Sequence, residues 1–216
     1  MTEDPRRVLD LISLGRVQHN WEKHYKLKEG DIFVEGGSFW GRYIWKASKN
    51  VGPKGRVIAV EPSPENIKIL KVLIKAENLE NVTLVEKALW NGPRRDLLFV
   101  QGNSASHQLK SLPSAQTGGP LPEYSNYVEV ELDTIDNILT DLGIKYVDLL
   151  SADIEGSELE MLKGCEKYLS EKRIRNIAVA VYHIRVDLQD SFMELLREKG
   201  YKDISREDEG IVYAHR

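Results

Sequence analysis

The stretch that decides the fold is DIFVEGGSFWG, residues 31–41. Its β-branched and aromatic run is typical of a buried strand, and three glycines (Gly36, Gly37 and Gly41) let the backbone turn tightly and approach a ligand closely. A strand, a glycine loop and a helix in this order open many nucleotide-binding units. Glu35 is unexpected in such a unit, because its carboxylate stands where a dinucleotide-binding protein receives a pyrophosphate.

The same alternation of strands and helices continues along the chain. Further strands are predicted at residues 56–62, 82–88, 146–156, 176–184 and 210–216. Helices are predicted from Gly41, from Pro64 with Ser63 as its cap, and over residues 157–169 and 187–201. Short connections of this kind make a parallel sheet with right-handed crossovers. The sequence therefore predicts an open, mostly parallel α/β sheet with helices on both faces.

Two segments depart from this rhythm. Residues 5–26 are predicted to form one or two helices, because Val8, Leu9, Leu11, Ile12 and Leu14 supply an apolar stripe. Residues 94–102 and 127–135 have strand character and are expected to form an inserted antiparallel hairpin around a long polar segment, residues 101–126. That segment is longer than ordinary connections and is interpreted as either a functional flap or a flexible loop. Residues 1–27 thus form an N-terminal helical segment, and residues 28–216 a single domain.

Composition limits the class of protein. The chain has 216 residues and a formal net charge of −4, which makes nucleic acid an improbable partner. Its one cysteine, Cys165, excludes an internal disulfide, and its place on a helical apolar face indicates core packing. Neither a signal sequence nor an apolar run of membrane-spanning length is found, so a cytoplasmic protein without membrane attachment is expected.

The acids at the strand ends indicate the kind of ligand. Glu61 ends the second strand, where a carboxylate can accept hydrogen bonds from ribose hydroxyls. Glu35 would repel a phosphate, by about 4 kcal/mol for two unit charges ~4 Å apart at an effective dielectric of 20. The glycines also lack the G-x-G-x-x-G spacing of dinucleotide sites. S-adenosylmethionine combines a ribose with an ammonium and a sulfonium, so Glu35 favours it over NAD, while Glu61 suits the ribose of either ligand.

Six pieces of the sequence occur in the order found in a known family. They are VEGGSFWG, GRVIAVEPSPEN, NVTLVEKAL, LDTIDNIL, ADIEGSELEMLKG and IAVAVYH. With them the chain resembles the FkbM-type family of class I methyltransferases over roughly residues 28–203. The resemblance implies a Rossmann-like class I methyltransferase fold with a seven-stranded sheet. In the family pattern D-x-G-A-N-x-G, Glu35 stands for the aspartate, Ser38 for the alanine and Phe39 for the asparagine.

The resemblance also implies which residues bind the cofactor, S-adenosylmethionine. The first loop, with Glu35, Gly36, Gly37, Ser38 and Gly41, would line the methionine and ribose end. Glu61 would hold the ribose hydroxyls, and Pro62 and Ser63 would shape the adenine side. Lys87 and Ala88 would border the adenine, and Asp153 would face the methionine portion or the substrate.

Candidate catalytic residues follow the later strands. His183 lies at the carboxyl end of IAVAVYH, one strand from Asp153 and Glu155, and is the candidate general base for a hydroxyl acceptor. Asp153 or Glu155 would orient His183 or that hydroxyl. Structural roles for the same residues stay open at this point. A divalent ion held by these three side chains is an alternative, although no metal is expected. His107 is interpreted as a flap or solvated loop residue, and His19, His24 and His215 receive no role.

The predicted function is O-methylation of a hydroxyl group on a small molecule or glycan. Two alternatives stay open: an inactive protein that binds S-adenosylmethionine and docks a partner, and a nucleic-acid methyltransferase. The second is disfavoured because ADIEG stands where amino-group methyltransferases carry D/N-P-P-Y/F. The sequence leaves the acceptor and the oligomeric state open.

Overall fold

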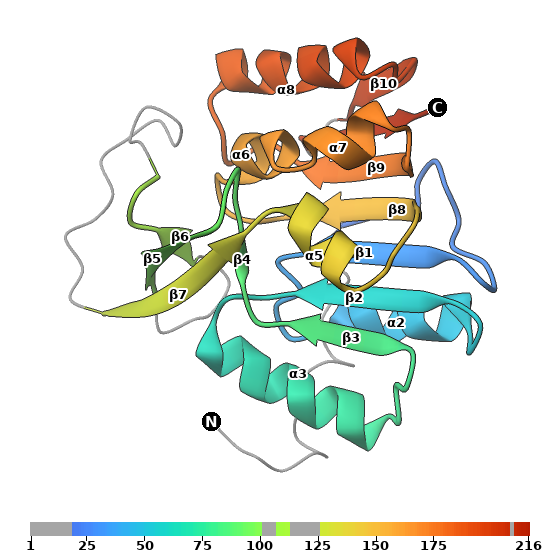
Figure 1. Cartoon of the computed structure of the whole chain (residues 1–216), viewed down its shortest axis with the longest axis vertical. Coiled ribbons are helices and arrows are strands. Elements are labelled where there is room, and N and C mark those ends of the chain that lie inside the picture. The colour runs from blue at the N-terminus through green and yellow to red at the C-terminus, as the bar shows by residue number, and fades with distance from the viewer. Residues whose placement is uncertain (1–18, 101–106, 113–125, 208–209) are drawn as a thin grey trace.

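The computed structural model describes residues 19–100, 107–112, 126–207 and 210–216. Its main element is a seven-stranded sheet in the order β10-β11-β9-β8-β1-β2-β3 (Figure 1). The strands are β1 (Ile32–Gly36), β2 (Arg56–Val60), β3 (Val82–Val85), β8 (Val147–Ala152), β9 (Ile174–Ala180), β10 (Asp203–Arg206) and β11 (Ile211–His215). Strands β3, β2, β1, β8 and β9 run parallel, and β11 and β10 complete the edge antiparallel. The predicted fold class is confirmed.

Both faces of the sheet are buried, which explains the nearly continuous apolar runs of its strands. Successive residues of β1 show this, because Phe33 and Val34 are both fully buried but belong to separate core clusters. Helix α2 (Arg42–Val51) packs in the cluster of Phe33. The cluster of Val34 contains residues of α5 (Ile135–Asp141), α6 (Glu158–Lys163), α7 (Glu166–Ser170) and α8 (Val186–Glu198). Helix α3 (Pro64–Ala76) connects β2 to β3.

A second sheet of four strands stands beside the first (Figure 1). Its order is β4-β7-β5-β6, from β4 (Ala88–Leu89), β5 (Arg94–Phe99), β6 (Gln108–Leu109) and β7 (Tyr127–Asp133). Strands β5 and β7 pair antiparallel along their whole length, so the predicted hairpin is present. Strand β6 lies inside the segment predicted as a flap or loop, whose residues 101–106 and 113–125 are outside the described residues.

The helix predicted for residues 5–26 is wrong where it can be checked. Residues 5–18 lie outside the described residues, and residues 19–27 form a turn and extended chain, not a helix. The turn is closed by a hydrogen bond from the Lys23 N–H to the Asn20 carbonyl. Side chains of this segment contact residues far along the chain, and these contacts replace the local bonds of a helix.

Other element boundaries also differ from the prediction. The strand predicted for residues 82–88 is two strands, because the chain leaves the main sheet after Val85 and Ala88 pairs with β7 of the second sheet. The helix predicted for residues 157–169 breaks at Gly164, where a Cβ atom would lie 2.2 Å from the Trp90 carbonyl oxygen. Cys165 is fully buried in the core, as expected. Helix α5 and strand β10 were not predicted. No helix in the described part of the chain combines the length and apolarity needed to cross a bilayer.

Candidate active site

A pocket lies at the carboxyl ends of the parallel strands, where open α/β sheets bind their ligands. It opens to solvent, and its empty space, counted together with the solvent at its mouth, is about 570 Å³. Gly37 and Glu61 contribute from the ends of β1 and β2, and Asp153 and Glu155 from the loop after β8. Leu89, Leu98 and Leu109 of the second sheet form an apolar wall. The inserted hairpin is therefore part of the site.

Glu61 joins the glycine loop to the start of α3. Its Oε2 accepts a hydrogen bond from the Phe39 N–H at 2.8 Å, and its Oε1 accepts bonds from the Ser63 N–H at 3.0 Å and Asn66 Nδ2 at 3.1 Å. Burial raises the pKa of Glu61 to about 7, against the opposing effect of these three donors. Oε2 has taken one hydrogen bond and keeps acceptor capacity for a ribose hydroxyl.

Glu35 is buried next to the pocket and does not line it. Its Oε1 accepts a hydrogen bond from Trp21 Nε1 at 2.9 Å, and its Oε2 is buried without a hydrogen-bond partner among the described residues. Burial raises the pKa of Glu35 to about 8; the Trp21 hydrogen bond lowers it, and the charges of Asp153 and Glu61 raise it further. Because burial disfavours the negative charge of Glu35, a cation nearby stabilises the ionised carboxylate and an anion nearby destabilises it.

The glycine loop has no room for side chains at its closest approach. Gly37 has φ +76°, and a Cβ atom there would lie 2.0 Å from the Asp153 carbonyl oxygen. A Cβ atom on Gly36 would lie 2.7 Å from Leu89, and one on Gly41 would lie 2.5 Å from Leu70 of α3. Phe39, in place of the family asparagine, has φ +50° and stacks on Trp40 at 4.7 Å. The loop is therefore packed too tightly to accept a side chain at any of these three glycines.

Of the residues predicted at the adenine side, all but Ser63 line the pocket. Pro62, Lys87 and Ala88 line it. Lys87 Nζ forms an ion pair with Asp133 at 2.7 Å, so its charge is directed to the end of β7. Ser63 is fully buried and precedes α3 as predicted, but its side chain makes no cap hydrogen bond. Ser38 is also buried, and its hydroxyl bonds to the Glu35 carbonyl oxygen at 3.1 Å.

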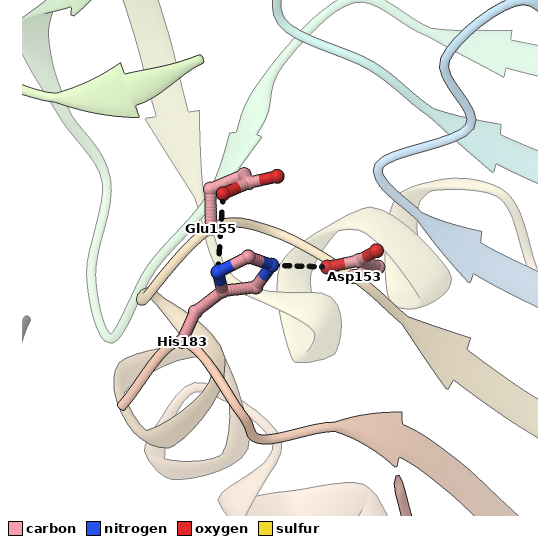
Figure 2. A group of neighbouring side chains, drawn as sticks. All are labelled: Asp153, Glu155 and His183. Carbon is pink, nitrogen blue, oxygen red and sulfur yellow. Dashed lines mark ion pairs between the residues drawn. The ribbon is translucent and has the colours of Figure 1, made fainter. Parts of the chain in front are cut away.

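The three predicted catalytic residues meet in space (Figure 2). The His183 ring lies between two carboxylates, with Nε2 3.4 Å from Asp153 Oδ1 and Nδ1 3.3 Å from Glu155 Oε2. Burial would lower the pKa of His183, but Asp153 and Glu155 outweigh it and raise the pKa. Burial raises the pKa of Glu155 to about 7. Asp153 behaves in the opposite way: His183 and His19 overcome its burial and hold its pKa well below the usual range.

Glu158 fixes the loop that carries Asp153 and Glu155. Its two carboxylate oxygens accept hydrogen bonds from the N–H groups of Ile154 and Gly156, each at 3.0 Å. Glu155 between them has φ +54°, a backbone conformation that is strained for a residue with a side chain. Such strain is kept only where neighbouring groups hold the backbone in place, and here the two hydrogen bonds to the Glu158 carboxylate hold it.

Two residues with contacts in the site, His19 and Tyr182, were missed by the sequence reasoning. His19 Nε2 lies 2.8 Å from Asp153 Oδ2, and the Tyr182 hydroxyl donates to the same oxygen at 2.9 Å. Trp21 donates to Glu35. The apolar stripe of the N-terminal region ends at Leu14. The absence of helical periodicity after that residue was the sign in the sequence that the following residues do not continue a helix. His107 lines the pocket, on the wall that includes Leu98 and Leu109.

The side chains of the site are suited to two ligands, a divalent metal ion and S-adenosylmethionine. The ligand atoms of Asp153, Glu155 and His183 all lie within 4.8 Å of one another, which is the arrangement that the alternative divalent ion requires. For S-adenosylmethionine, the structure supplies the buried Glu35 oxygen without a partner, the Gly37 cradle and the remaining acceptor capacity of Glu61. These features fit a ligand with a ribose and a positive charge.

Comparison with known proteins places the chain in a family. Residues 25–202 match the family model of the methyltransferase FkbM domain. The chain belongs to the FkbM methyltransferase family. The family's cofactor, S-adenosylmethionine, agrees with the prediction from the strand-end acids. The chain is also 34% identical over 88 residues to methyltransferase sdnD of Sordaria araneosa, a match that covers 37% of this chain and 33% of that protein.

Solved structures share the fold. The FkbM methyltransferase of Methylobacillus flagellatus has a TM-score of 0.65 at 17% identity, over 98% of this chain and 50% of that one. A SAM-dependent O-methyltransferase of Thermotoga maritima has a TM-score of 0.51 at 14% identity, over 97% of this chain and 70% of that one. The chain thus spans half the length of the Methylobacillus protein and a third of sdnD.

Proposed function

We propose that this FkbM-family chain transfers a methyl group from S-adenosylmethionine to a hydroxyl oxygen of a small molecule or glycan. The observation that carries the proposal is the pocket at the strand ends. It joins Glu61 and the glycine loop to the loop of Asp153 and Glu155, which hold His183 between them.

In the proposed reaction the residues divide into two groups. Glu61 and the glycine loop bind the ribose, and the apolar wall of the second sheet excludes water. When bound, S-adenosylmethionine would supply a methyl carbon activated by its sulfonium for transfer to the acceptor oxygen, with S-adenosylhomocysteine as the other product. Alignment of donor and acceptor can contribute ~7–11 kcal/mol to such a step.

His183 receives the proton that the acceptor hydroxyl loses. Asp153 faces its Nε2 and Glu155 faces its Nδ1, so the ring is held in place from both sides. Because the pKa of Glu155 is about 7, Glu155 and His183 can share a proton near neutral pH. A positioned base of this kind contributes about 10²–10⁴-fold to the rate.

Two measurements test the proposal in sequence. Calorimetric titration with S-adenosylmethionine and S-adenosylhomocysteine should show binding, with NAD as the negative control and Glu61→Ala as the variant that loses it. Release of S-adenosylhomocysteine is then measured with a panel of hydroxylated small molecules and glycans. Cofactor binding without release for any acceptor would favour the inactive binding protein, and absence of cofactor binding would refute the proposal.

The role of His183 has its own test. His183→Ala should keep the cofactor affinity of the wild type and lose transfer, because the ring contacts the carboxylates of Asp153 and Glu155, whereas Glu61 and the glycine loop are assigned to the cofactor. Addition of EDTA separates this base from the alternative divalent ion. Transfer that persists in His183→Ala would remove the proposed base, and loss of transfer in EDTA would favour the ion.

A further inference from the structure

The segment of residues 19–27, called here the anchor segment, is built into the domain. Glu22 is 3% exposed, accepts a hydrogen bond from the Leu27 N–H at 2.8 Å and pairs with Lys46 of α2 at 2.7 Å. The hydroxyl of Tyr213 in β11 donates to the Asn20 carbonyl oxygen at 2.9 Å. The segment is therefore held against both α2 and β11.

Two side chains of the anchor segment each contact one carboxylate of the site. Trp21 Nε1 donates to Glu35 Oε1 at 2.9 Å, and His19 Nε2 lies 2.8 Å from Asp153 Oδ2. The two aromatic rings lie 4.5 Å apart, and both side chains are largely buried: Trp21 is 4% exposed, and the His19 side chain is 10% exposed. The segment thus connects the end of β1 to the loop after β8.

The two carboxylates differ in what their second oxygen meets. Glu35 Oε2 is buried and has no hydrogen-bond partner among the described residues, whereas Asp153 Oδ1 faces His183 Nε2 at 3.4 Å. Asp153 lines the pocket, and its charge acts on Glu35 in the neighbouring strand β1. Two acids fixed in this way are stabilised by a cation between or beside them. The Trp21 contact leaves Glu35 Oε2 available, and the His19 contact holds Asp153 through its Oδ2.

We propose that His19 and Trp21 are positioning residues of the cofactor site, which hold Asp153 and Glu35 for the positively charged methionine end of S-adenosylmethionine. This inference rests on the cofactor binding proposed above. It goes beyond the family, whose matched region begins at residue 25 and contains neither side chain. It also joins the anchor segment to the function of the domain that follows it.

The experiment measures cofactor affinity in the full chain by calorimetry with S-adenosylmethionine. Trp21→Phe removes the indole N–H and keeps an aromatic ring, and His19→Ala removes the contact with Asp153. Each should weaken binding about tenfold, the effect expected for loss of a hydrogen bond to a charged group. His19→Gln keeps an N–H donor of similar reach and should recover most of the affinity.

A matched control separates positioning from folding. His24 belongs to the same segment and also pairs with a carboxylate, that of Glu207 at 3.1 Å, but this pair lies on the surface. His24→Ala should bind the cofactor as the wild type does. The indole N–H resonances, assigned by Trp21→Phe, add a direct readout: that of Trp21 should shift when the cofactor binds.

The outcomes are distinct. Wild-type affinity in both Trp21→Phe and His19→Ala would overturn the proposal. Tighter binding in either would overturn it too, because it would mean that the anchor segment obstructs the site. Failure of His19→Gln to recover affinity, together with a lowered melting temperature in all variants, would assign the segment a structural role only. If the wild type binds no cofactor, the proposed function itself fails.

Discussion

A Glu35→Gln variant should uncouple cofactor binding from proton release. Burial raises the pKa of Glu35 to about 8, so in the ligand-free protein at pH 7 about ten of every eleven molecules hold a proton on this side chain. A ligand that carries a positive charge favours the ionised carboxylate, and its binding therefore expels the proton. Glutamine keeps an oxygen that can accept the Trp21 hydrogen bond but cannot ionise.

The size of the effect follows from the pKa. Ionising a group one pH unit below its pKa costs about 1.4 kcal/mol, or about tenfold in affinity. The affinity of the wild type should therefore rise about tenfold from pH 6 to pH 7 through Glu35, and more if Glu61, with a pKa of about 7, ionises as well. This window avoids the titration of the cofactor's own amino group, which lies near pH 8.

Calorimetry in buffers of different ionisation enthalpy gives the number of protons released. At pH 7 the wild type should release about 0.9 proton more than Glu35→Gln. S-adenosylhomocysteine, which lacks the sulfonium charge, should release less than S-adenosylmethionine from the wild type. Equal proton release in the wild type and the variant would refute the reasoning. An affinity that does not change between pH 6 and pH 7 would refute it as well.

The same carboxylate gives the ligand-free protein a pH-dependent stability. Because the pKa of Glu35 is raised by folding from 4.5 to about 8, its contribution is fully present below about pH 4.5 and is lost as the pH rises through 8. Melting temperatures without ligand should therefore fall over this range in the wild type and fall less in Glu35→Gln. Parallel curves would contradict the raised pKa.

Three further predictions concern the rest of the site. Since the pKa of His183 is raised, the transfer rate should increase with pH through a value above 6.5, and Glu155→Gln should move that rise to lower pH; an unmoved pH profile would exclude the coupling. Gly37→Ala should abolish cofactor binding in calorimetry, because its Cβ atom would lie 2.0 Å from a carbonyl oxygen, whereas Gly92→Ala, with nothing within 4 Å, should be silent. Glu158→Gln should lower kcat about tenfold with the fold intact by circular dichroism, because an amide offers one acceptor oxygen to two backbone N–H groups; an unchanged kcat would contradict the positioning of the loop.

Much of this arrangement could be predicted because parallel strands bring their carboxyl ends to one edge of a sheet. Glu61, Asp153 and His183 each follow a buried apolar run, so their convergence needed only the order of the strands. The register placed β9 beside β8, which put His183 next to Asp153. Apolar periodicity and the ends of strands depend on residues that are close in the sequence, so they can be predicted from it.

The missed residues lack such local signals. His19 contacts a residue 134 positions away, and nothing near it in the sequence records that contact. Helix α5 has only seven residues and follows β7 directly, so its first residues resembled the end of the strand. The run VTLVEKAL resembled one strand because the chain changes sheets within it, between Val85 and Ala88, without a glycine or proline.

The crowding of acids in and beside the pocket has a consequence for the lifetime of the protein. Glu35, Glu61, Glu155 and Glu158 all have raised pKa values, so burial opposes the charge on each of them in the ligand-free state. A ligand that relieves this cost stabilises the folded chain, by about 2.7 kcal/mol at a free concentration one hundred times its Kd. The supply of S-adenosylmethionine would then set how much of the chain escapes proteolysis, and so the amount of protein as well as its rate of turnover.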